Sequence, residues 1–278
     1  MKQAILVLLT ALCAGCGSFE WFPKNDVFQN TSTAAPTPPP AAVISKSVSF
    51  PSGVTWISDL AFDKSSATFW LLAKATSLSA APDALVKFNP ATGVADPPLL
   101  QAPLILPVPA TIVDGSFLAF DGVSFFITSN GFNNSIPVSE IYQFNENGFF
   151  LNKYDCPATS TGFCQGLTWD STTDSFWVAG SDNKNLVNFS VSSGVATLIK
   201  KTYKNRWGTN GVSDIGFDSA TNHLLVLKGG MIPVNAANGN VGIKNSFTLP
   251  GNGRGDWDGS FFWVIDNTNK LLDAVVVK

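Results

Sequence analysis

Four polar residues could do chemistry because they occupy nearly the same place in successive copies of one repeated phrase. The phrase is an aromatic residue followed by Asp, and three or four residues ahead of it stand Asp59, Gln165, Asp214 and Arg254. Two carboxylates, an amide and a guanidinium gathered at one point could hold a cation or a polar ligand. The same side chains could instead form hydrogen bonds to the backbone of nearby loops. Both interpretations require a fold that brings distant segments together.

The aromatic–Asp pairs indicate which fold that is. They are Phe62-Asp63, Phe120-Asp121, Trp169-Asp170, Phe217-Asp218 and Trp257-Asp258. Self-similarity at this spacing of about 40–58 residues is typical of blades or solenoid repeats. A turn follows each Asp, and its two lengths differ by two residues, which keeps every side chain on its original sheet face. The short turns begin with Asp-Gly, a strong hairpin signal. These pairs are expected to belong to the scaffold.

Each hairpin is followed by a third apolar segment and by a turn closing on Gly. The third segments are Leu85–Phe88, Ile141–Phe144, Leu186–Phe189 and Met231–Val234. Four strands per unit predict an all-β fold, a five-bladed β-propeller of four-stranded antiparallel blades. The fifth unit has no residues left for a fourth strand, so residues 44–50 are expected to close the ring as an N-terminal strand and to cover a sheet edge. The alternative is a β-sandwich or an open stack.

Composition limits the functions open to this chain. Charged residues make up 13% and the net charge is −3, so a basic surface for nucleic acid is not expected. His223 is the one histidine, and it falls in a turn on the face opposite the longer loops, which argues against a His-based triad. Residues 44–278 are read as a single propeller domain, with no catalytic residue, metal or cofactor predicted.

The N-terminal residues predict export. Lys2 precedes a short apolar stretch that is too short to span a bilayer and is typical of a signal peptide. The run Leu12-Cys13-Ala14-Gly15-Cys16 resembles the bacterial lipoprotein processing box, although Cys13 stands where Leu is usual. The resemblance implies cleavage after residue 15 and acylation of Cys16, which would anchor the protein to the membrane. An ordinary cleaved signal with an unmodified Cys16 is the alternative.

The residues after Cys16 bear on localisation. Gly17 and Ser18 stand where Asp would favour inner-membrane retention, so the segment resembles that of an outer-membrane lipoprotein of the cell envelope. Residues 16–43 carry the lipidated Cys and a Pro- and Thr-rich stretch, which predicts a tether that holds the propeller off the membrane.

Two further cysteines, Cys156 and Cys164, lie eight residues apart. In an exported protein they are expected to form a local disulfide with a structural role. A metal site would need more ligands than two thiols.

The longer loops of the propeller are where a ligand is expected. They join one blade to the next, or a second strand to a third, and emerge on one face of the ring. Arg206 and Trp207 stand side by side on such a loop, an arrangement common in recognition sites. Trp207 could instead cover the seam between two blades.

The blade phrase resembles that of NHL, YVTN and SMP-30-type propellers, and Gln165-Gly166-Leu167 is loosely similar to an element of five-bladed glutaminyl cyclases. A lactonase of the SMP-30 kind would need Glu, Asn and Asp around a divalent metal, and the only Glu residues of the predicted propeller are Glu140 and Glu146. We therefore expect a non-enzymatic binding module at the cell envelope with a protein or glycan partner. A propeller enzyme or a purely structural envelope subunit is the alternative.

Overall fold

The computed structural model describes ten segments of the chain, all in the predicted propeller domain apart from two residues that precede it. They are residues 42–74, 84–95, 115–133, 136–157, 163–180, 185–192, 195–202, 212–228, 230–242 and 253–277. Every regular element within them is a β-strand, and none of them forms a helix able to cross a membrane. The predicted signal peptide, the lipidated Cys16 and nearly all of the tether lie outside the described residues.

The strands form five antiparallel sheets. The first is β2 (Trp56–Asp63), β3 (Thr68–Lys74), β4 (Ala84–Asn89) and β5 (Val94–Ala95). The second is β6 (Gly115–Phe120), β7 (Ser124–Asn133), β8 (Ile136–Asn145) and β9 (Phe150–Asp155). The third is β10 (Cys164–Asp170), β11 (Ser175–Gly180), β12 (Leu186–Ser192) and β13 (Val195–Thr202). The fourth is β14 (Asp214–Asp218), β15 (His223–Leu227) and β16 (Met231–Asn235). The fifth is β17 (Gly255–Trp257), β18 (Phe262–Asp266), β19 (Leu271–Val277) and β1 (Ala42–Ser49).

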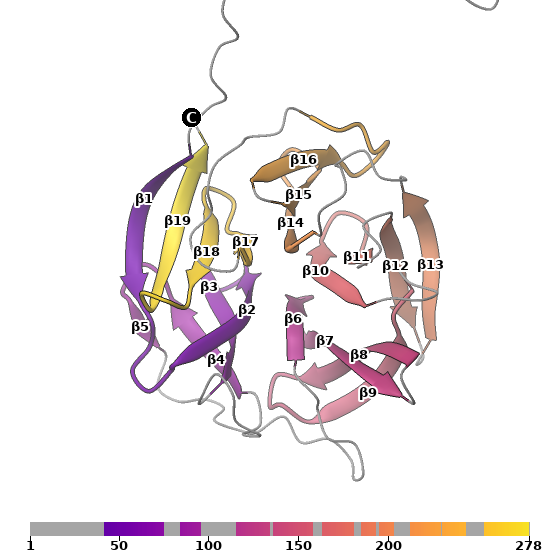
Figure 1. Ribbon diagram of the computed structural model, residues 1–278, viewed down its shortest axis with the longest axis horizontal. Coiled ribbons are helices and arrows are strands. Elements are labelled where there is room, and N and C mark those ends of the chain that lie inside the picture. The colour runs from indigo at the N-terminus through magenta and orange to yellow at the C-terminus, as the bar shows by residue number, and fades with distance from the viewer. Residues whose placement is uncertain are drawn as a thin grey trace, which may run out of the picture. The chain divides into compact units, whose positions relative to one another are not determined.

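The five sheets are the blades of a propeller. The first strand of each sheet is innermost, and β2, β6, β10, β14 and β17 surround the central axis (Figure 1). Each of these strands contacts the first strand of the next blade, and β17 contacts β2. The ring is therefore complete, and the predicted five-bladed β-propeller is confirmed.

A strand from the N-terminal side closes the ring, as predicted. β1 pairs antiparallel with β19 from Ala42 opposite Val277 to Ser49 opposite Leu271. It thereby covers the edge that β19 would otherwise expose and supplies the fourth strand of the fifth blade.

The fourth blade shows three of the predicted four strands in the part of the chain that the structure describes. A single bridge between Val234 and Val241 leads toward a fourth. Pro233 lies in the middle of β16 and has no N–H to donate, so a regular ladder along this edge is interrupted. The carbonyl of Pro233 still accepts a hydrogen bond from the N–H of Gly242, 2.8 Å away.

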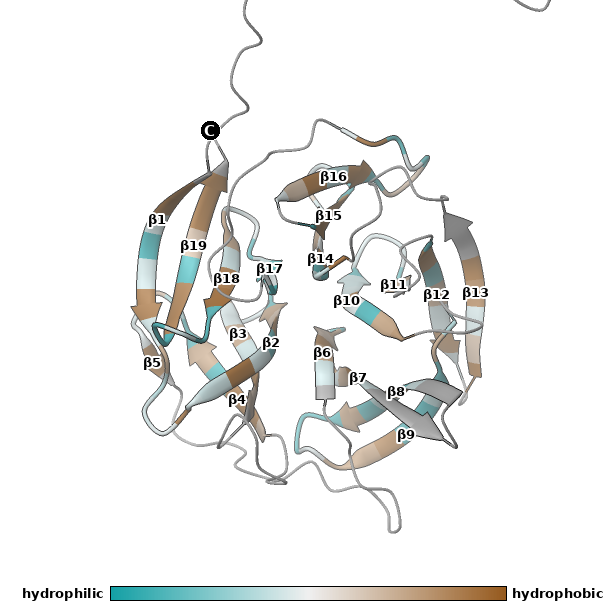
Figure 2. Cartoon of the chain, viewed as in Figure 1, coloured by the Kyte–Doolittle hydropathy of each residue, from teal (hydrophilic) through white to brown (hydrophobic). Residues whose placement is uncertain are grey.

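The hydrophobic core consists of five seams, one between each pair of adjacent blades. Two adjacent apolar residues on each second strand explain this, because neighbouring side chains of a strand point to opposite faces. Phe69 packs in the seam with the fifth blade, whereas Trp70 packs in the seam with the second. The other blades divide the equivalent pairs in the same way: Phe125-Phe126, Phe176-Trp177, Leu224-Leu225 and Phe262-Trp263. Apolar segments accordingly appear on strands of every blade (Figure 2).

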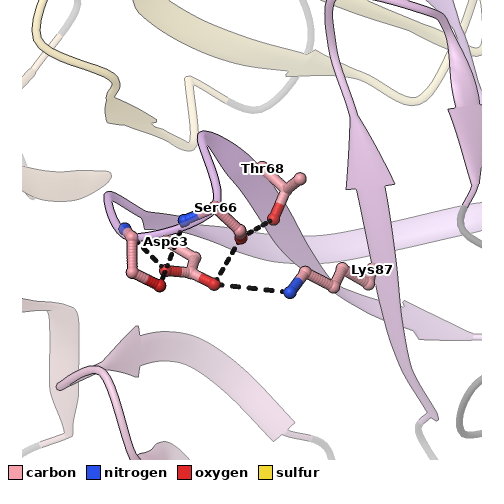
Figure 3. Close-up of polar contacts among 5 residues, drawn as sticks. Asp63, Ser66, Thr68 and Lys87 are labelled. Carbon is pink, nitrogen blue, oxygen red and sulfur yellow. Dashed lines mark hydrogen bonds and ion pairs between the residues drawn. The ribbon is translucent and has the colours of Figure 1, made fainter.

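The Asp of each repeated phrase holds the turn that follows it. Asp63 accepts hydrogen bonds from the backbone N–H of Ser65 at 2.9 Å and from the hydroxyl of Ser66 at 2.6 Å, and it pairs with Lys87 at 3.5 Å (Figure 3). The four other Asp residues also accept turn N–H groups. A carboxylate at this position therefore satisfies the turn's N–H donors, which confirms that these residues belong to the scaffold.

The predicted disulfide between Cys156 and Cys164 is confirmed, with the two Cα atoms 6.3 Å apart. Cys156 directly follows β9, and Cys164 begins β10, so the bond staples the connection between the second and third blades. The N–H of Cys164 donates to the hydroxyl of Ser139 at 2.9 Å, and the N–H of Cys156 donates to the carbonyl of the same residue. The staple is thus tied to β8 as well as to its own loop.

Candidate functional site

The structure brings three of the predicted site residues together on the axis. Asp59, Asp214 and Arg254 lie in or next to β2, β14 and β17, which belong to three different blades. We call them the polar hub. Asp59 and Asp214 are each only 1% exposed, and Arg254 is half-buried.

Each hub residue bonds to the backbone of a neighbouring blade. Asp59 accepts from the N–H of Leu118 at 2.7 Å, and Asp214 accepts from the N–H of Gly255 at 2.9 Å. Arg254 donates to two carbonyl oxygens, that of Ser58 at 2.9 Å and that of Ser116 at 2.8 Å, with its guanidinium 4.5 Å from the Phe117 ring centre. The hub therefore ties the first, second, fourth and fifth blades together.

The two hub carboxyls are expected to share a proton. Oδ1 of Asp59 is buried and meets no N–H or hydroxyl donor in the described part of the chain, and its carboxyl lies within hydrogen-bonding reach of that of Asp214. Two carboxyl groups can bond to each other only if one carries a proton. Burial raises the pKa of Asp59 well above its usual value, with the charge of Asp214 adding to the effect, and burial raises the pKa of Asp214 to about 6.

Proton-sharing carboxyls are typical of acid–base catalysis, but these two are enclosed by protein. Their partners are backbone N–H groups and the nearby Arg254. The arrangement that the structure shows is thus a link between blades, which is the second of the two interpretations given to these residues above.

The other predicted site residues are on β10 or outside the description. Gln165 is half-buried on β10, and its buried Oε1 has no hydrogen-bond partner among the described residues. Next to it, Gly166 takes a φ of +77° in a β-bulge. Arg206 and Trp207 lie outside the described residues.

A cavity of about 510 Å³ lies at the C-terminal ends of the inner strands, whereas the hub residues lie in or just before the N-terminal halves of theirs. All five inner strands and their hairpin turns line it. The aromatic residues of the repeated phrase all contribute to its wall: Phe62, Phe120, Trp169, Phe217 and Trp257. Phe62, Trp169 and Trp257 are only partly buried. The volume lies within the range of known small-molecule sites, about 300–1,000 Å³.

Asp256 is one of the carboxylates in this wall. Its Oδ2 accepts from the N–H of Phe62 at 2.9 Å, and its Oδ1 faces the backbone of Gly216. It is thus enclosed by β2 and β14 on either side of its own strand. Burial raises the pKa of Asp256 to about 7, and Asp214 and Asp258 add to the shift.

Sequence reasoning did not single out this cavity. It assigned the aromatic anchors to the scaffold and looked for a ligand at the inter-blade loops, on the opposite face. The available signal was the repetition itself, because one aromatic residue at the same height on each of five inner strands must form a ring once the propeller closes.

The residues considered for catalysis lie elsewhere. Glu140 on β8 accepts hydrogen bonds from Lys153, at 2.7 Å, and from the hydroxyl of Tyr142. His223 begins β15 at a hairpin turn. No cluster of three metal-ligating side chains is present in the ten described segments.

No protein-family model and no curated protein matches the sequence. Among solved structures, the calcium-binding protein regucalcin from Agrobacterium tumefaciens is 12% identical with a TM-score of 0.52, over 83% of this chain and 95% of that one. A chain of the nidogen–laminin complex is 14% identical with a TM-score of 0.49, over 76% and 72% of the two chains. Hydrazine synthase from Kuenenia stuttgartiensis is 8% identical with a TM-score of 0.43, over 71% of this chain and 51% of that one. At these identities the regucalcin likeness supports the fold alone: the chain is a β-propeller.

Proposed function

We propose that this chain is an exported, lipid-anchored binding module of the cell envelope whose propeller binds a small ligand, or a small group projecting from a protein or glycan, in the central cavity. The observation that carries the proposal is the cavity of about 510 Å³ lined by all five inner strands. A rigid ring with a largely apolar pocket and a few fixed polar groups is the usual form of a ligand site.

The anchor rests on the processing box around Cys16. We expect the mature protein to begin at Cys16 and to carry acyl chains. Two or more lipid chains would hold the protein stably to a membrane. Mass spectrometry of the mature N-terminal peptide checks this, with Cys16→Ser as the control that should remain unprocessed. A mature protein that begins at an unmodified residue would contradict the anchor and leave the binding site unaffected.

Access to the cavity can be tested with two matched cysteine variants. Ala61 lines the cavity, and Ala73 on the adjacent strand β3 does not, yet both are buried. In the full-length mature protein, methyl methanethiosulfonate should modify Ala61→Cys at least tenfold faster than Ala73→Cys under native conditions. Modification is followed by mass spectrometry.

Equal protection of both cysteines would show that the cavity admits no small molecule and would overturn the proposed function. Equal melting temperatures of the two variants before labelling serve as the control for folding.

A further inference from the structure

The wall of the cavity combines aromatic rings with an excess of negative charge. Besides the five aromatic residues, it contains five carboxylates and one lysine: Asp63, Asp121, Asp218, Asp256, Asp258 and Lys64. Asp63 has a counter-charge in Lys87, whereas Asp256 has backbone N–H partners only among the described contacts. A pocket of this charge attracts cations and repels anions.

The rings provide a second, independent attraction for the same class of ligand. The face of an aromatic ring attracts a cation, and enclosure between several rings is the usual way in which proteins bind alkylated ammonium groups. The ring of Phe62 packs against that of Phe69, with the ring centroids 5.1 Å apart, and the ring of Trp169 packs against that of Phe176 at 4.7 Å. Each pair joins the two strands of one hairpin, so the hairpins hold these rings in place.

We infer that the central cavity binds an organic ammonium ion, with the cation among the aromatic rings near Asp256. The inference rests on the proposed function, because it names the ligand class of the same cavity.

Choline is a suitable probe, since it combines a quaternary ammonium group with a hydroxyl. Its neutral isostere, 3,3-dimethyl-1-butanol, has the same shape without the charge. In calorimetric titrations of the full-length mature protein, we expect choline to bind at least tenfold more tightly than the isostere. Methyl glucoside serves as a neutral saccharide that could also stack on aromatic rings.

Two tryptophan variants separate the ring contribution from general effects. Trp169→Leu removes a ring of the cavity wall but keeps an apolar side chain, and we expect it to weaken choline binding about tenfold. Trp56→Leu removes a half-buried ring outside the cavity and should leave choline binding unchanged.

Asp256→Asn supplies a pH signature that a structural role alone would not produce. A bound cation favours the charged form of Asp256, so choline should bind more tightly as the pH rises from about 6 to 8 and should release a proton. The charged groups around Asp256 are Asp214 on β14, Asp258 on its own hairpin, and Asp63, Lys64, Asp121 and Asp218 of the surrounding turns. The Asn variant should bind choline with little dependence on pH.

Binding of the isostere or of the glucoside as tightly as choline would overturn the inferred ligand class, as would choline binding that is unaffected by Trp169→Leu. Failure of choline to bind would also overturn it, and rapid labelling of Ala61→Cys would show that the cavity is nevertheless open. The two proposals can therefore fail separately.

Discussion

The folded protein should become more stable as the pH falls from 8 to 5. Asp59, Asp214 and Asp256 all have raised pKa values in the fold, about 6 for Asp214 and about 7 for Asp256, against an ordinary value of 3.8. Between about pH 4 and 7 the folded chain therefore holds protons that the unfolded chain has released, so stability falls as the pH rises through this window. Because one pKa unit corresponds to about 1.4 kcal/mol, the difference should reach several kcal/mol. Urea unfolding followed by tryptophan fluorescence across the pH series measures it.

Below about pH 4 the trend should reverse. Asp63 and Asp266 have lowered pKa values in the fold, because hydrogen bonds to their carboxylates outweigh the effect of burial. Their stabilisation is present above the unfolded pKa and is lost as the pH falls through the folded value. Maximal stability is thus expected at about pH 4–6.

Two conservative variants test whether the polar hub causes this pH dependence of stability. Asn at position 59 can accept from the N–H of Leu118 and donate to Asp214, as the protonated Asp59 does, so Asp59→Asn should flatten the pH dependence and stabilise the protein at pH 8. Asp214 accepts two N–H groups, from Ile215 and Gly255, so Asp214→Asn should destabilise by about 1–3 kcal/mol at every pH. An unchanged slope in Asp59→Asn would contradict the shared proton.

Gly255→Ala should destabilise the ring by about 4 kcal/mol or more and lower the yield of folded protein sharply. A Cβ at this position would lie 1.8 Å from the carbonyl oxygen of Trp263 and 3.0 Å from the ring of Phe262. The carbonyl belongs to the paired strand β18, so it cannot move without breaking the sheet. Chemical denaturation, or the melting temperature where enough protein folds, measures the loss.

Gly122→Ala is the matched control. Gly122 has a φ of +98°, yet a Cβ there meets nothing within 4 Å. The variant should cost only the backbone strain of that φ, about 1–2 kcal/mol. Equal losses for Gly122→Ala and Gly255→Ala would sink the steric explanation.

Much of the fold could be predicted because it depends on local patterns that repeat. The aromatic–Asp phrase identifies the hairpins, and the two-residue difference in turn length keeps each side chain on the same face of its sheet. The lack of a fourth strand in the last unit predicts the strand that closes the ring. In the fourth blade the described residues show three of the four predicted strands and a single bridge toward a fourth, beside Pro233. The disulfide followed from spacing and from the expected export.

The site was harder to predict because it depends on which way side chains point after the ring has closed. The register grouped Asp59, Asp214 and Arg254, which the structure places close together, but no pattern shows that the carboxyls of Asp59 and Asp214 meet there. The aromatic wall of the cavity was missed because the same residues also explain the blades. The roles of Arg206, Trp207 and Cys16 stay predictions.

The pairing of β1 with β19 also bears on how the protein reaches its folded state. Ala42 and Val277 stand at nearly opposite ends of the propeller sequence, so their contact has a very large sequence separation. Contacts of this kind form slowly, because the intervening loop must be ordered before they contribute. β1, the first strand of the propeller in the chain, therefore stays unpaired until β19 has been synthesised. If the chain is exported as proposed, its ring would close only after the whole propeller has crossed the membrane.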